Sequence, residues 1–144
     1  MLRNRLIHPP LLQALAAAGH GSRVLIADGN YPIATAVGDA AIRIHLNLSP
    51  GVLDVEQVLE VLMDAVTFEA AHVMSPDAPP EPPVFERFRV LLRPAIDHIG
   101  LLDRADFYAT ARGPDVAVAI ATGDQRLYAN LLLTIGVVPP GDHP

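Results

Sequence analysis

A histidine in a glycine-flanked loop is the first residue of this sequence with an evident chemical use. His20 lies between Gly19 and Gly21, and the short apolar run that follows ends at Asp28. Imidazole is the side chain that changes charge nearest neutral pH, and a carboxylate can fix which of its nitrogens holds the proton. Polar loop residues at strand ends are where α/β proteins bind ligands. The pattern indicates an acid/base or ligand site; the alternative is that Gly19 closes a helix and His20 merely occupies a surface loop.

A second polar cluster lies near the C-terminus, in the sequence Ala-Thr-Gly-Asp-Gln-Arg-Leu-Tyr-Ala-Asn at residues 121–130. Its side chains offer hydrogen-bond donors and acceptors suited to vicinal hydroxyl groups. Two plainer interpretations stay open. Arg126 could simply pair with Asp124 on the surface, and Tyr128 could be an ordinary core residue with its hydroxyl at the edge.

Missing residue types exclude several chemistries. The chain has no cysteine, and all ten of its cationic residues are arginines. Disulfides, thiolate catalysis and cysteine metal sites are therefore excluded, as are Schiff-base and pyridoxal mechanisms, which need a lysine amine. There is no Gly-x-x-x-x-Gly-Lys loop and no Gly-x-Gly-x-x-Gly motif. The histidines lack pairwise metal spacing, and His45 falls on the polar face of a strand, so we expect no metal site.

Composition limits the partners. The net charge is −6, which argues against binding a nucleic-acid backbone, because phosphate contacts need clustered basic residues. The apolar fraction is 51%, yet no apolar run approaches the ~18 residues of a membrane helix, and the N-terminus lacks the apolar core of a signal peptide. We therefore expect a cytoplasmic protein without a membrane partner. Surplus apolar surface predicts a homo-oligomer.

Hydrophobic spacing predicts alternating helices and strands. Apolar positions at helical spacing follow Pro9–Pro10, Asp54, Pro83 and Asp103, and the pair Asp54 and Gln57 is typical of a capping box. Strands are expected over 23–27, 41–48, 66–74 and 115–121, and an apolar run covers 131–138. This order predicts an α/β fold, a three-layer α/β/α sandwich formed by one domain over residues 1–144. Within it we expect a proline-rich internal loop at 75–83 and a frayed tail at 139–144.

Two motifs together carry a resemblance to a known family. Gly-His-Gly-Ser-x-x-x-x-Ala-Asp-x-Asn-x-Pro at 19–32 resembles the N-terminal signature of the ribose pyranase and fucose mutarotase (RbsD/FucU) family. Ala-Thr-Gly-Asp-x-x-Leu-Tyr-Ala-Asn at 121–130 resembles its C-terminal signature. Both stand in the family's order and near the expected ends, so the resemblance spans the whole domain.

The resemblance implies a mixed, mainly parallel sheet and an isomerase that needs no cofactor. The enzyme would interconvert ring forms or anomers of a monosaccharide by general acid–base ring opening and reclosure. His20 matches the family's catalytic histidine. The matched substrate-binding residues are Asp28, Arg112, Tyr128, Ala129 and Asn130. The alternative is a non-catalytic monosaccharide-binding or transport-associated protein on the same fold.

A strand of five residues separates the two halves of this predicted site. At about 3.3 Å per residue, His20 and Asp28 would lie some 16 Å apart at opposite ends of the strand. A site completed by a neighbouring subunit removes the difficulty, and the resemblance implies ring-like oligomers with sites at subunit boundaries. Residues 113–114 look like a small insertion beside Arg112, and the segment 64–74 departs from the family pattern. The signatures lean towards the fucose type but leave D-ribose open.

Overall fold

The structure is a computed structural model that describes residues 1–143, and it contains one six-stranded mixed sheet. The strand order is β2-β5-β1-β6-β3-β4. Strand β6 (Leu131–Ile135) runs antiparallel to both of its neighbours, β1 (Arg23–Ala27) and β3 (Phe68–Met74). The pairs of β1 with β5 (Val116–Ala121), of β2 (Ile42–His45) with β5, and of β3 with β4 (Gly100–Leu102) are parallel. The sheet is therefore mixed and mainly parallel, which confirms the expected fold class.

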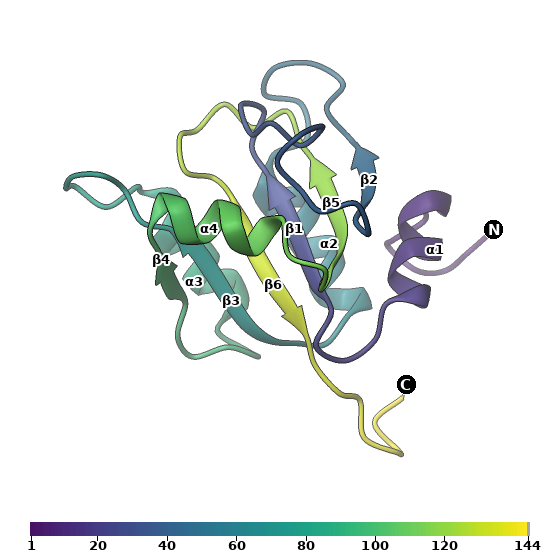
Figure 1. Cartoon of the computed structure of the whole chain (residues 1–144). Helices are drawn as coiled ribbons and strands as arrows, with labels where there is room; N and C mark the ends of the chain where they lie inside the picture. The colour runs from purple at the N-terminus through teal and green to yellow at the C-terminus, as the bar shows by residue number, and fades with distance from the viewer. Residues whose placement is uncertain (144) are drawn as a thin grey trace.

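Within residues 1–143, four helices cover the sheet in the predicted order. They are α1 (Pro9–Ala17), α2 (Val55–Ala65), α3 (Val84–Leu92) and α4 (Arg104–Ala111). Figure 1 shows α4 in front of the sheet and α2 and α3 behind it. The central strands β1, β5 and β6 are buried on both faces, as expected of strands with almost wholly apolar sequences. Three layers result, with one apolar core on each side of the sheet.

Local sequence explains where the helices begin. The Asp54 carboxylate accepts a hydrogen bond from the backbone N–H of Gln57, whose side chain accepts one from the Asp54 N–H. This reciprocal pair is the capping box that the sequence predicted for α2. Asp103 caps α4 by accepting from the Asp106 N–H. The first helix starts at Pro9, whose missing N–H costs nothing in a first turn.

The predicted elements differ from the structure most clearly in two places. The strand expected over 41–48 ends at His45, because this edge strand pairs only with β5 before the chain turns at residues 49–51. The alternation of apolar residues over 41–48 predicts a buried Leu48, but Leu48 lies beyond the strand and is exposed. The three-residue strand β4 was not predicted, since it is too short to show a period. Of the expected tail, residues 139–143 form no helix or strand and are exposed; Pro144 lies outside the described residues.

Candidate functional site

An aspartate and an asparagine that are 102 residues apart in sequence form the centre of the site. Asp28 follows the last residue of β1, and Asn130 precedes the first residue of β6. Because the two strands are antiparallel neighbours, these positions meet at one edge of the sheet. Asn130 Nδ2 donates to Asp28 Oδ2 at 2.9 Å, and the Asp28 N–H donates to Asn130 Oδ1 at 2.8 Å. Both side chains are thereby fixed in orientation.

The Asp28 carboxylate is held by a turn of its own backbone. Its Oδ1 accepts from the N–H groups of Asn30 and Tyr31, each at 2.9 Å. Burial raises the pKa of Asp28 above its ordinary value, and the hydrogen bonds from Asn30, Asn130 and Tyr31 oppose that effect without cancelling it. A carboxylate with a raised pKa is a stronger base than an exposed carboxylate, and it accepts a stronger hydrogen bond from a hydroxyl group. Its Oδ2 keeps a lone pair beyond the bond from Asn130.

A pocket of about 240 Å³ opens above this pair. Tyr128 lines it with a φ of +62°, in the left-handed region that a bulky residue rarely adopts and that is concentrated at functional sites. Arg104, from the first turn of α4, donates to the Tyr128 hydroxyl at 3.3 Å and to Asp77 Oδ2 at 3.1 Å. Asp77 belongs to the proline-rich segment 75–83, so that segment is bound to two residues that line the pocket. The remaining lining residues are Asn30, Tyr31, Met74, Tyr108 and Leu127.

Two stacked tyrosines form one wall. The rings of Tyr31 and Tyr108 are 5.2 Å apart and nearly parallel. Arg112 lies against this wall, with its guanidinium carbon 5.5 Å from the centre of the Tyr108 ring. Arg112 is absent from the pocket lining, whereas Arg104 belongs to it. Sequence reasoning missed Arg104 because no motif marks it; its only signal is its place as the first residue of a capped helix.

The loop that carries Tyr128 is anchored to α2 by a buried aspartate. Both Asp124 oxygens bind Arg126, and Asp124 Oδ2 also accepts from the Val55 N–H at 3.0 Å. Burial alone would raise the pKa of Asp124, but the bonds from Arg126 and Val55 lower it below its ordinary value. The pairing of Arg126 with Asp124 allowed by the sequence is therefore present, and it has a structural use. A Cβ on Gly123 would lie 2.4 Å from the Ser49 carbonyl oxygen, so only glycine fits there.

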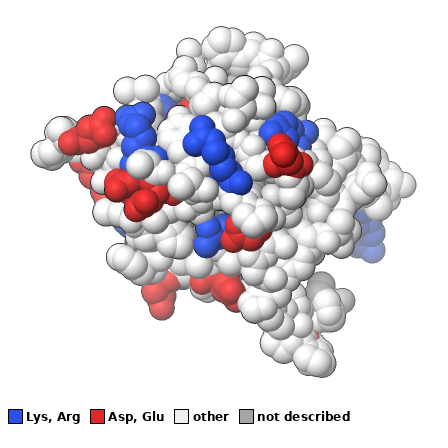
Figure 2. Space-filling view, viewed as in Figure 1, with Lys and Arg blue, Asp and Glu red and all other residues white. Residues whose placement is uncertain are grey.

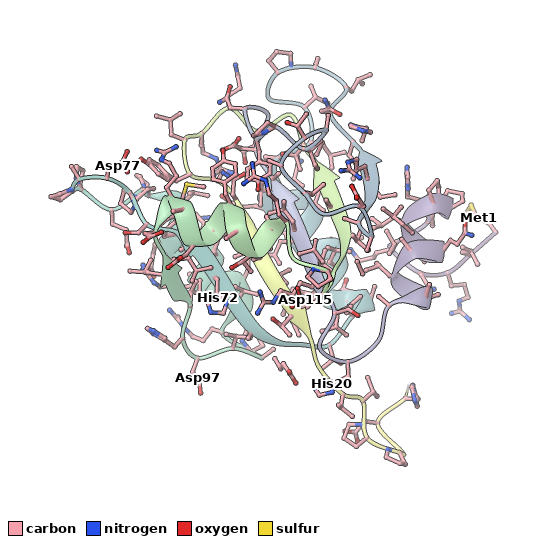
Figure 3. All side chains as sticks on the ribbon, in the orientation of Figure 1. Met1, His20, His72, Asp77, Asp97 and Asp115 are labelled. Atoms are coloured by element: carbon pink, nitrogen blue, oxygen red, sulfur yellow. The ribbon has the colours of Figure 1, made fainter. Side chains whose placement is uncertain are left out.

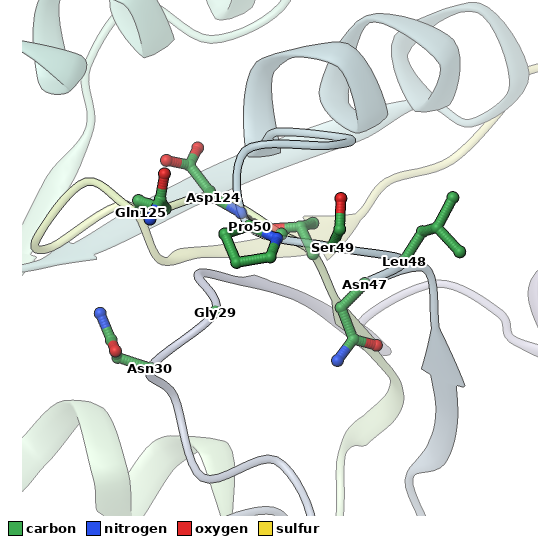
Figure 4. A pocket seen from close by; sticks show the side chains of 10 residues that line it. Gly29, Asn30, Asn47, Leu48, Ser49, Pro50, Asp124 and Gln125 are labelled. Atoms are coloured by element: carbon green, nitrogen blue, oxygen red, sulfur yellow. Dashed lines mark hydrogen bonds between the residues drawn. The ribbon is translucent and has the colours of Figure 1, made fainter.

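A second, polar hollow of about 440 Å³ adjoins the pocket (Figure 4). Asn30 lines both spaces. Figure 4 shows Asn47, Ser49 and Pro50 on the segment after β2, with Gln125 and Asp124 to their left. The hollow lies beside the ends of the parallel strands β1, β2 and β5, which is where open α/β sheets bind ligands.

His20 lies at the opposite end of the sheet from this pocket. It precedes β1 at the end where β6 finishes, and the Gly21 N–H donates to the Ile135 carbonyl at 2.9 Å. Figure 3 shows His20 in the lower part of the molecule and Asp77, which contacts Arg104 and Tyr128, at the upper left. The His20 side chain is 59% exposed, and its Nε2 is 3.1 Å from both carboxylate oxygens of Glu69. Within one chain, His20 therefore does not reach Asp28.

Three of the six predicted residues therefore line the pocket, namely Asp28, Tyr128 and Asn130. Ala129 lies between Tyr128 and Asn130 in the sequence and is fully buried, so it does not belong to the lining. His20 and Arg112 lie outside the pocket lining. Among residues 1–143, no three histidine, aspartate or glutamate side chains converge on a possible metal position, and no helix is long and apolar enough to cross a membrane. Figure 2 shows arginines interspersed with acidic residues on the face drawn.

Comparison with known proteins places these features in a family. A profile described as the RbsD / FucU transport protein family matches residues 1–138. The fucose mutarotase of Homo sapiens is 30% identical, over 92% of this chain and 90% of its own length. The D-ribose pyranase of Pseudomonas entomophila is 30% identical, over 95% and 98%. FucU from Bifidobacterium longum superposes with a TM-score of 0.80 at 29% identity, covering 92% of this chain and 96% of that one.

More distant structures share the fold. RbsD of Bacillus subtilis, solved in complex with D-ribose, superposes with a TM-score of 0.83 at 24% identity and covers 96% of this chain and 100% of its own. The strands and helices that position the pocket therefore belong to a fold that this chain shares with RbsD over 96% of its length.

Proposed function

The chain belongs to the RbsD / FucU transport protein family, and on that premise we propose that it is a sugar mutarotase or pyranase, an isomerase. Relatives at 30% identity act, by their names, on fucose and on D-ribose, and both align along nearly the whole chain. The substrate is therefore a monosaccharide of the L-fucose or D-ribose class. The observation that carries the proposal is the fixed Asp28–Asn130 pair at the base of a pocket lined by polar and aromatic side chains.

The pocket suits a sugar ring chemically. Asp28 Oδ2 accepts from one sugar hydroxyl through its remaining lone pair, and Asn130 Nδ2 donates its second hydrogen to another. Arg104 and the Tyr128 hydroxyl, which now bind Asp77, supply further donors. The tyrosine rings give an apolar wall for the sugar's C–H face. We propose Arg104 as the direct cationic contact, while Arg112 supports the Tyr108 ring.

Ring opening needs two proton movements. A base takes the proton of the anomeric hydroxyl as the bond between C1 and the ring oxygen breaks, and the ring oxygen gains a proton. The open aldehyde rotates about the bond between C1 and C2, and the same steps in reverse close the ring on the other face. We propose that His20 takes the proton of the anomeric hydroxyl and delivers a proton to the ring oxygen, and that it moves the proton back on reclosure, because an imidazole can accept and release a proton near neutral pH.

His20 reaches the sugar from a neighbouring subunit in this proposal. The distance along β1 excludes it from the pocket of its own chain, whereas its exposed position suits a subunit boundary. The protein would therefore be a homo-oligomer whose site combines the pocket of one chain with His20 of the next. This arrangement needs no cofactor, and it predicts that isolated monomers are inactive.

Saturation-transfer NMR on equilibrated L-fucose and D-ribose tests the activity. A catalytic amount of protein should speed exchange between anomers or ring forms of one of these sugars. Acceleration for L-fucose alone would choose the fucose type, and acceleration for D-ribose the pyranase type. If neither sugar exchanges faster but one still binds, the protein is a monosaccharide-binding member of the family instead.

A further inference from the structure

Glu69 stands beside His20 in a geometry that no motif of the sequence signals. The two Glu69 oxygens are equidistant from His20 Nε2, at 3.1 Å. An ionised carboxylate only accepts hydrogen bonds, so this contact is favourable only when Nε2 carries a proton. The neutral ring is therefore the Nε2–H tautomer, and its Nδ1 lone pair is left free as the base.

An irregularity in the sheet places Glu69 in this position. Along the pairing of β3 with β6, Phe68 faces Ile135 and Ala70 faces Thr134, so Glu69 is an extra residue without a partner. A bulge of this kind re-aims a side chain and is common beside active sites. The space it needs is kept by Gly136, where a Cβ would lie 3.2 Å from the Glu69 Cβ.

The same strand ends hold the histidine loop. The Ile135 carbonyl accepts from the Gly21 N–H, and the Ile135 N–H donates to the Ser22 carbonyl at 2.9 Å. The His20 loop and the Glu69 bulge are thus attached to neighbouring residues at the end of β6. Their relative position is set by backbone hydrogen bonds rather than by the ion pair alone.

We propose that Glu69 is a positioning residue for His20: it holds the imidazole in the Nε2–H tautomer and directs Nδ1 to the sugar in the adjoining subunit. When Nδ1 takes the anomeric proton, the ring becomes a cation, and the carboxylate 3.1 Å away stabilises that charge. The catalytic part of this proposal rests on the proposed function. The tautomer of His20 does not depend on the proposed function.

The ring nitrogens of His20 report the tautomer directly. In ¹⁵N-labelled protein above the pH at which the imidazole is charged, we expect Nε2 to show a protonated shift and Nδ1 an unprotonated one. In Glu69→Gln the two shifts should move towards each other, because a neutral amide can donate or accept and no longer selects one tautomer. The control Glu60→Gln changes an exposed glutamate that pairs with Arg5 and should leave both shifts unchanged. Identical His20 shifts in the wild type and in Glu69→Gln would overturn the proposal.

A double-mutant cycle tests the catalytic consequence. Because the pair is partly exposed, we expect Glu69→Gln to slow sugar exchange at saturation by about two- to fivefold, with sugar affinity unchanged. In a His20→Ala background, Glu69→Gln should have no further effect, since it acts only through the imidazole. An equal loss in both backgrounds would refute the positioning role. If the wild type catalyses no exchange, the proposed function fails, while the ¹⁵N result still decides the role of Glu69.

Discussion

Mixing two inactive variants tests whether each site is shared between subunits. His20→Ala removes the acid/base group and leaves the pocket intact. Arg104→Glu removes a donor and places a carboxylate near Asp28 and Asp77; the Arg104 side chain is 54% exposed, so the fold should survive. Each variant alone should be inactive.

The expected recovery follows from the separation along β1. Five strand residues span about 16 Å, several times the reach of a hydrogen bond, so one chain cannot supply both halves of a site. In co-expressed, randomly assembled 1:1 oligomers, a boundary is active when its pocket comes from the His20→Ala chain and its histidine from the Arg104→Glu chain. About a quarter of boundaries meet both conditions, so about a quarter of wild-type exchange should return.

Size-exclusion chromatography and mass spectrometry establish that both chains are present in one assembly, and saturation-transfer NMR measures the exchange. The control is a mixture of separately purified oligomers analysed before their subunits exchange, which should stay inactive. Mixed oligomers with no recovered activity would refute the shared site, and so would a fully active monomer.

Three further predictions concern the pocket and the loop that carries it. Arg104→Leu should weaken sugar binding by about tenfold or more, because it removes one hydrogen bond to a charged group. Arg112→Leu should weaken sugar binding by less than about threefold, because Arg112 lies against the Tyr108 ring and outside the pocket lining. Calorimetry measures both affinities, and equal effects of the two substitutions would contradict these assignments. Gly123→Ala should lower the free energy of unfolding by about 1–3 kcal/mol, because the added Cβ would meet the carbonyl oxygens of Ser49 and Val52. The control Gly19→Ala should leave the free energy of unfolding unchanged, because no atom lies within 4 Å of the added Cβ. Urea denaturation measures the free energy of unfolding of both variants. Asp124→Asn should cost about 1–3 kcal/mol at pH 7. Because folding lowers the pKa of Asp124, the ionised carboxylate stabilises the fold at any pH above its ordinary pKa of 3.8, and this contribution is lost as the pH falls through the folded-state pKa. The unfolding free energies of the wild type and the variant should therefore converge in acid. A constant difference between them down to the lowest pH would exclude the Asp124–Arg126 ion pair as the source of the stabilisation.

Most of the fold could be predicted from the sequence because its signals are local. The capping box of α2, the proline start of α1 and the apolar run of β1 each determine one element without reference to the rest. The exposed Leu48 and the strand β4 could not be predicted. The first depends on where an edge strand stops pairing, and the second is too short to carry a pattern.

The residues of the site also differ in whether the sequence could predict them. Asp28, Tyr128 and Asn130 belong to motifs and could be chosen by residue type and order. Arg104 and Glu69 could not, because each is defined by a contact with a distant segment. Arg112 shows the converse: the resemblance matched it to a substrate contact, whereas in the structure its guanidinium lies against the Tyr108 ring, outside the pocket lining.

The central claim is that this protein turns over a monosaccharide rather than merely holding it. One NMR comparison tests it most directly: wild type and His20→Ala, each with the sugar that binds, measured for both binding and anomer exchange. Because His20 lies outside the pocket lining, the variant should bind the sugar with little change and lose exchange by about 10²–10⁴-fold. Unchanged exchange in His20→Ala, or no catalysed exchange in the wild type, would contradict the claim.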